Sequence, residues 1–252
     1  MNLNQEMAQE ITQEVAWCKR NFGGLAISAG ILFLIFELTS LDYFLADLFF
    51  DFTHTTFPLK NNFWLTQINH QWIKFLIIAF GLAVGIYYLA GFRLIKRPKH
   101  HALIGLAVLS MLLVPAIVGL LKQNSDRFCP WDIKRYGGTQ EHVSFLTFAA
   151  IKQNQGRCFP AGHASAGFAL LALYIVWRQK NPNTARYFWV SAFALGMVMG
   201  IGQQIRGAHF LSHTLWTAWL SWFTVVLVYF LYLQRQNRKK SIPKLYRQSF
   251  TP

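Results

Sequence analysis

Six segments of the chain are long and apolar, and polar loops separate them. They cover residues 24–40, 72–92, 102–121, 164–179, 186–205 and 214–234. A helix needs about 20 apolar residues to cross a bilayer, so each segment is expected to span a membrane. The fourth segment is short, so its helix is expected to begin within the Pro160–His163 stretch. No polar–apolar alternation typical of strands competes. The pattern therefore predicts an all-α bundle of six transmembrane helices.

The basic residues of the loops predict an orientation. Fifteen lysines and arginines lie in four short segments, at residues 19–20, 93–99, 178–186 and 235–247, whereas eight lie in the much longer loops on the other side. Because lysine and arginine accumulate in short cytoplasmic loops, both termini are expected in the cytoplasm. The long loops then face outward, which for a bacterial inner membrane means the periplasm.

Composition agrees with an integral membrane protein. Apolar residues make up 54% of the chain and charged residues only 13%, against about 25% charged in a soluble domain. The net charge of +14 sits in short runs between apolar segments, which indicates contact with membrane lipids and no nucleic-acid partner.

The chain divides into three parts on this basis. Residues 1–22 form a polar cytoplasmic N-terminal segment, either an amphipathic helix or disordered, and without a cleavable signal peptide. Residues 23–235 form the six-span membrane domain. Residues 236–252 form a basic cytoplasmic tail.

Cations and glycine gather where the apolar segments meet the outer loops. Lys122 directly follows the third segment, Arg127 lies five residues later, and Arg206 follows the fifth segment. Guanidinium groups suit phosphate oxygens. Gly162 precedes an apolar helix, whose N-terminal N–H groups attract anions. These four residues are predicted to bind phosphate.

Three histidines belong to the same outer face. His209 and His213 are four residues apart, so in a helix they would share one side. One can attack phosphorus and form a phosphohistidine while the other orients it, and His163 can serve as general acid and base. The pair could instead ligate zinc, but no His-Glu-x-x-His pattern accompanies it. Neither a metal nor another cofactor is expected.

These residues resemble the motifs of the type 2 phosphatidic acid phosphatase/haloperoxidase superfamily. The first motif is Lys, six residues, Arg-Pro; the second is Pro-Ser-Gly-His; the third is Ser-Arg, five residues, His, three residues, Asp. Here they correspond to Lys122 with Pro130, to the Pro160–His163 stretch, and to His209 with His213. The resemblance implies six spans, an outward-facing active site, His209 as nucleophile, His163 as acid and base, and Lys122 as a phosphate ligand.

The chain departs from that pattern at four positions, each with a residue of different chemistry. They are Cys129 for Arg, Ala161 for Ser, Gln203 for Arg and His213 for Asp. Arg127 and Arg206 lie close enough along the chain to reach the same pocket in place of the missing arginines. His213 as a neutral acceptor would replace the orienting carboxylate.

Two cysteines accompany the outer motifs. Cys129 and Cys158 would both lie in an oxidising compartment, so a disulfide between them is expected, with two free thiols as the alternative. Cys18 would be cytoplasmic and reduced.

The resemblance implies a lipid phosphate phosphatase that hydrolyses a lipid phosphate or diphosphate at the outer face. Its partners would be that substrate and the membrane lipids. A lipid phosphotransferase with the same phosphohistidine, and a non-catalytic lipid-binding or transport protein, remain alternatives. Phosphatidic acid, phosphatidylglycerophosphate, polyprenyl diphosphate and lipid A stay open as substrates.

Overall fold

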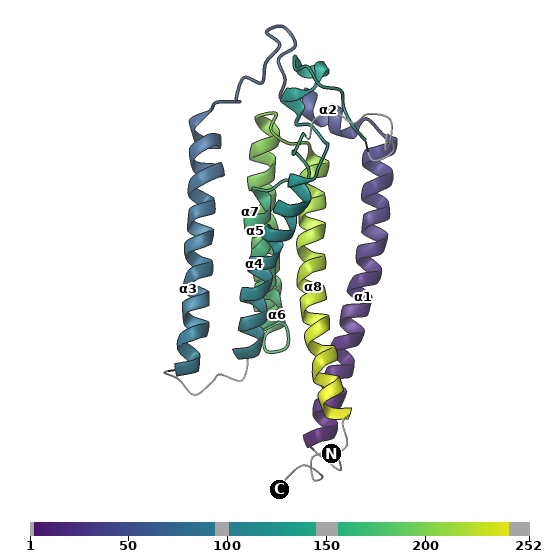
Figure 1. Ribbon diagram of the computed structural model, residues 1–252, viewed down its shortest axis with the longest axis vertical. Helices are drawn as coiled ribbons and strands as arrows, with labels where there is room; N and C mark the ends of the chain where they lie inside the picture. Colours follow the sequence, from purple (N-terminus) through teal and green to yellow (C-terminus); the bar gives the residue numbers. More distant parts are fainter. Residues whose placement is uncertain (1–2, 94–100, 145–155, 242–252) are drawn as a thin grey trace.

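A computed structural model describes residues 3–93, 101–144 and 156–241 (Figure 1). Within them the chain is helical and contains no strand. The long helices are α1 (Leu3–Leu38), α3 (Ile73–Arg93), α4 (His101–Gln123), α7 (Pro182–Ile205) and α8 (Leu211–Ser241). The short ones are α2 (Leu41–Asp47), the π-helix η1 (Trp64–Trp72), the 3-10 turns η2 (Pro130–Asp132), η3 (Lys134–Tyr136) and η4 (Leu170–Ala172), and the helices α5 (Ala164–Ala169) and α6 (Leu173–Trp177).

Five helices of the described chain are long and apolar enough to cross a membrane, one fewer than the six spans predicted. They are Ala8–Leu38, Trp64–Gly91, His101–Gln123, Pro182–Ile205 and Leu211–Arg238. The fourth predicted span is the shorter apolar helix Ala164–Trp177. It begins after the Pro160–His163 stretch and not within it, because residues 162 and 163 form a turn that ends at the helix. α1 begins at Leu3 and runs without a break through the described part of the segment assigned to residues 1–22.

The helices place the predicted site residues at one end of the bundle (Figure 1). The start of α1, the end of α8 and the connection between α6 and α7 lie at the opposite end. The basic loop at residues 94–100, the outer-loop stretch 145–155 that contains Lys152, and the tail beyond Ser241 lie outside the described residues. The end that carries the residues after α4, before α5 and before α8 is called the site end below.

Small residues let α5, α7 and α8 approach closely beneath the site end. A Cβ on Gly167 of α5 would lie 2.7 Å from the Cα of Gly196 in α7, and one on Gly200 would lie 2.1 Å from Thr214 of α8. Helices in a membrane pack through such small residues, because lipid supplies no hydrophobic force between them. These contacts fix the positions of His163 and His213 along the bundle axis, because each histidine lies within one turn of the start of a packed helix.

A buried polar cluster ties α1 to the rest of the bundle at the opposite end. The Glu14 side chain forms an ion pair with Arg178 and accepts a hydrogen bond of 2.9 Å from the Tyr229 hydroxyl. The side chains of Glu14 and Arg178 are only 10% and 13% exposed. A charge at this depth is tolerated because it is paired.

We predict that Glu14→Ala destabilises the protein by about 3–5 kcal/mol, since it leaves the Arg178 guanidinium buried without its partner. Thermal unfolding of purified protein in detergent measures the loss. Glu10→Ala, at an exposed position one turn away, is the matched control. Equal midpoints for the two variants would contradict the role assigned to Glu14.

Candidate active site

Three backbone segments meet at the site end and hold one another by main-chain hydrogen bonds. Arg157 and Cys158 donate to the carbonyl oxygens of Ser125 and Arg127, each at 2.9 Å. Ala161 donates to the carbonyl of His213 at 3.3 Å. The residues after α4 and the Pro160–His163 turn are therefore fixed to each other and to the start of α8. All nine predicted site residues lie on these segments or beside them.

His209 and His213 form a buried pair. They are 3% and 2% exposed, and their Nδ1 atoms lie 3.4 Å apart. His209 precedes α8, so the expectation that both stand on one helix is wrong; only His213 is helical. The rings still meet, because the 206–210 connection turns back onto the first turn of α8. An Nδ1–H that His209 donates to a neutral His213 leaves the lone pair of His209 on Nε2, the nitrogen that would attack phosphorus in the predicted mechanism.

Burial keeps His209 uncharged. Its pKa is well below the usual value, first because the ring is removed from water and then because His213, Lys122 and His163 lie near. A neutral imidazole has a free lone pair and can act as a nucleophile at ordinary pH.

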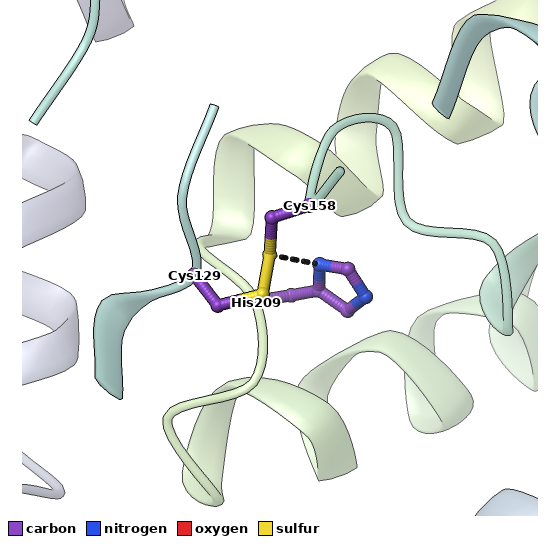
Figure 2. Close-up of side chains that lie close together, drawn as sticks. All are labelled: Cys129, Cys158 and His209. Atoms are coloured by element: carbon purple, nitrogen blue, oxygen red, sulfur yellow. Dashed lines mark hydrogen bonds between the residues drawn. A yellow bond between two sulfur atoms is a disulfide. The ribbon is translucent and has the colours of Figure 1, made fainter. Parts of the chain in front are cut away.

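Cys129 and Cys158 form a disulfide beside His209 (Figure 2). Their Cα atoms are 5.2 Å apart, and the Cys158 Sγ lies 3.3 Å from the His209 Nδ1. The two sulfurs and a nitrogen of His209 all lie within 4.8 Å of one another. Metal binding to cysteine requires thiolates, and these sulfurs are bonded to each other. In this form the disulfide supports the ring of His209.

Lys122 lies against the Gly162 backbone. A Cβ on Gly162 would be 3.5 Å from the Lys122 Cδ and 3.7 Å from its Nζ. An added Cβ would make only ordinary van der Waals contact there, so the Lys122 side chain packs directly against the Pro160–His163 turn. The Lys122 charge contributes to lowering the pKa of both His163 and His209, so it lies near both rings.

His163 is the N-cap of α5 and carries a strongly perturbed imidazole. Burial, followed by His70, Lys122, Lys74 and Arg206, lowers its pKa to about 3. Its Nδ1 is buried and has no hydrogen-bond partner within the described chain. Buried polar atoms are nearly always paired, so the free nitrogen indicates space for a ligand atom.

Two site residues are absent from the sequence-based prediction. The ring of His70, in η1, lies 3.5 Å from that of His163, centroid to centroid. Lys74, four residues later in α3, lines a cavity together with Gly162 and His163. His70 and Lys74 are four residues apart at the site end of an apolar segment, a spacing that would place both on one face of a helix. The sequence did not reveal the pair, because the predicted span began at residue 72 and so separated His70 from Lys74.

The two arginines predicted to compensate for the missing motif arginines lie in different surroundings. Arg127 is buried, and its Nη1 is 3.7 Å from the Glu37 Oε1. Burial lowers the Arg127 pKa, and Glu37 opposes that effect. Arg206 donates from Nη1 to the Gln203 Oε1 at 2.9 Å and from Nε to the Lys60 carbonyl at 2.8 Å. Whether either binds phosphate stays a prediction.

Two buried carboxylates near the end of α1 also reach this region. One is Glu37, beside Arg127. The other is Asp42, which accepts a hydrogen bond of 3.0 Å from the Ser212 N–H in the first turn of α8. Burial raises the Asp42 pKa to about 6 despite the bonds from Ser212. Neither carboxylate was predicted from the sequence, because both lie outside the loops that carry the motifs.

An apolar cavity of about 670 Å³ leads away from the site between α3 on one side and α4 with α5 on the other. Lys74, Gly162 and His163 lie at its polar end. Most of the other lining residues are aliphatic or glycine, among them Ile78, Gly85, Leu112 and Gly119.

Comparison with known families identifies one match. The PAP2 superfamily matches residues 103–238, more than half of the chain. This range contains all nine predicted site residues and excludes His70 and Lys74. No curated protein and no solved structure matches the chain.

We predict that the double variant Cys129→Ser/Cys158→Ser loses both stability and activity. Opening a loop with a sequence separation of 29 costs about 3 kcal/mol in the chain-entropy model, and the His209 ring loses its support. Thermal unfolding and phosphate release measure the two effects. Cys18→Ala removes a thiol at the opposite end and is the control. An unchanged midpoint together with unchanged turnover would refute the prediction.

His213→Asp should retain activity, because a carboxylate also accepts the Nδ1–H of His209. His213→Ala should lower kcat by about tenfold or more, since the nucleophile loses its orienting partner. Steady-state rates of the two variants, with the exposed His54→Ala as control, test this. If His213→Ala matches the wild type, another group orients His209, and Asp42 becomes the first candidate.

Proposed function

Because the chain belongs to the PAP2 superfamily, whose members generally act as phosphatases, we propose that it hydrolyses a lipid phosphate or diphosphate. The reaction runs through a phosphohistidine on His209. The site faces outward, in the periplasm of a bacterial inner membrane, with both termini in the cytoplasm. The basic bias of the short loops supports that orientation.

The observation that carries a lipid substrate is the cavity between α3 and α4. It combines a long aliphatic lining with a polar end, where Lys74 supplies a positive charge and His163 an imidazole. An amphiphile matches both parts, with its chain between the helices and its phosphate at the site end. A soluble phosphate ester has no chain that would fill the aliphatic part of the cavity, so lipid or water would occupy it instead. The same cavity is the reason to prefer a lipid phosphatase over a phosphatase of small soluble esters.

The chemistry follows from the side chains already placed. The Nε2 of His209 forms a bond to phosphorus while the bond from phosphorus to the leaving oxygen breaks, and the electron pair stays on that oxygen. In a monoester this oxygen takes a proton from His163 acting as general acid. Lys122 and the N–H groups of Gly162 and His163 stabilise the equatorial oxygens. Water then attacks the phosphohistidine, with His163 as the base that accepts its proton, and His209 leaves as a neutral ring with inorganic phosphate released.

The test is phosphate release by purified protein in lipid–detergent micelles, with His209→Ala as the control. His209→Ala should lower turnover on the order of 10³-fold or more while its thermal midpoint stays near that of the wild type. A covalent phosphoprotein, labile to acid and stable to alkali, should form in the wild type only. A phosphoprotein that gives up phosphate only to a second lipid would identify a phosphotransferase. Neither phosphoprotein nor phosphate release would identify a binding or transport protein.

The cavity makes a separate prediction about substrate length. Gly85 lines it, and a Cβ there meets nothing within 4 Å, so Gly85→Trp would fill the cavity without disturbing a packed neighbour. The ratio of kcat/KM for a long-chain lipid phosphate to that for p-nitrophenyl phosphate should fall about tenfold. Gly30→Trp, at an exposed and equally open position of α1, should leave the ratio unchanged. An unchanged ratio in Gly85→Trp would place the lipid chain elsewhere.

A further inference from the structure

The cations of the site, with the imidazoles beside them, fall into two groups on either side of Gly162. Lys122 lies over Gly162 and near His209. His70, Lys74 and Arg206 gather around His163, on the side where the apolar cavity begins. This second group is absent from the family motifs, and the attack of His209 on phosphorus does not use it. Among the described residues, no carboxylate forms an ion pair with Lys74, Lys122 or Arg206.

Helix packing brings the second group together from three elements. The Asn69 side chain, next to His70 in η1, donates a hydrogen bond of 3.0 Å to the Val198 carbonyl of α7. Gly202 of α7 lies so close to Asn69 that a Cβ there would be 2.7 Å from its side chain. The end of α7, which leads into Arg206, is thereby fixed against η1. Lys74 follows His70 by one turn.

Two buried polar atoms in this region have no partner in the described chain. One is the His163 Nδ1 and the other is the Gln203 Nε2. Gln203 is 2% exposed, and its Oε1 already accepts a hydrogen bond from Arg206. A buried amide without a hydrogen-bond partner destabilises the fold, so a donor held here indicates a ligand oxygen. Phosphate supplies such oxygens to both Gln203 and Arg206.

The charge of the two groups exceeds that of one phosphate monoester. Lys74, Lys122 and Arg206 supply three positive charges without an ion-paired carboxylate. A phosphate monoester carries about −1.5 to −2 at pH 7. A second phosphate adds about one further negative charge, because its single remaining acidic proton is lost well below neutral pH. A diphosphate therefore matches the cations, whereas a monophosphate leaves about one positive charge unpaired at a low-dielectric membrane end.

We propose that His70, Lys74, Gln203 and Arg206 form a second phosphate subsite, and that the substrate is a lipid diphosphate. The terminal phosphoryl group lies at Lys122 and His209, and the lipid-linked phosphate lies in the second subsite at the mouth of the cavity. This order follows the cavity itself, which reaches Lys74 and His163 but has neither His209 nor His213 in its lining. The assignment rests on the proposed function and names its substrate class.

The subsite also changes what the leaving group requires. As the His209 Nε2 bonds to the terminal phosphorus, the bond to the bridging oxygen breaks and its electron pair stays on that oxygen. The leaving group is then a lipid monophosphate, a far weaker base than an alkoxide, so it departs without taking a proton. Lys74 and Arg206 stabilise the charge that it gains. Water supplies the hydroxyl group of the released inorganic phosphate, and its other proton passes to His163 and then to solvent.

Binding to the His209→Ala protein tests the subsite without turnover. The probes are geranylgeranyl diphosphate and geranylgeranyl monophosphate, which share one chain, titrated in the same detergent. The diphosphate should bind about tenfold more tightly or better, as expected for at least one added charge-assisted hydrogen bond. Lys74→Met in the same background should reduce this ratio to near one. Lys60→Met is the matched control; it removes an amine that lies over Trp131 at the same end, and the ratio should persist.

Wild-type turnover of both lipids separates the two possible failures. Phosphate release from both at equal kcat/KM, with equal affinities, would overturn the subsite and leave the phosphatase intact. A diphosphate preference that survives Lys74→Met, and also survives His70→Asn, would likewise overturn it. If neither lipid binds and neither is hydrolysed, the proposed function itself fails, and the subsite fails with it.

Discussion

The site depends on removing His209 and His213 from water. Both rings lie in a nearly closed space at the end of an apolar bundle, where a charged imidazole would lose its hydration. Burial therefore holds His209 neutral, and its Nδ1 faces His213 and the disulfide. The other nitrogen is left with a lone pair directed away from both. The neutral form of the proposed nucleophile is thus set by exclusion of water, and within the described part of the chain no carboxylate forms a hydrogen bond or ion pair with the ring.

Two of the departures from the family motifs belong together electrostatically. Cys129 in place of arginine removes a positive charge, and His213 in place of aspartate removes a negative one. The two replacements together leave the net charge of the motif residues unchanged. The disulfide then fills the space beside the ring, and Arg127 is balanced by Glu37 from α1.

The pattern of apolar segments and loops predicted which residues share the site end, because a chain that crosses the membrane repeatedly brings every second loop to the same side. It also paired Cys129 with Cys158, which the structure joins. It did not predict where the helices α5 and α8 begin beside the site. His209 lies before α8, and α5 begins after His163, since local turns and not helical periodicity decide those residues. His70 was missed for a related reason. It lies in a π-helical stretch that continues the second span beyond its aliphatic part, and hydropathy alone gives such a stretch no strong signal.

The space between α3 and α4 leads to the site from one side of the bundle. Gly81, Gly85 and Gly119 line the space between them, and an added Cβ at Gly85 or Gly119 would meet nothing within 4 Å. The two helices instead make contact at the opposite end, where the Tyr88 and His101 rings stack at 4.4 Å. A pair joined at one end and lined by small residues along its length leaves a passage that is open to the lipid phase. Glycine keeps that passage wide, and Lys74 places a positive charge at its end beside His163. Under the proposed function, an amphiphile would enter with its anionic group toward Lys74, so the bundle itself would set the orientation of the substrate.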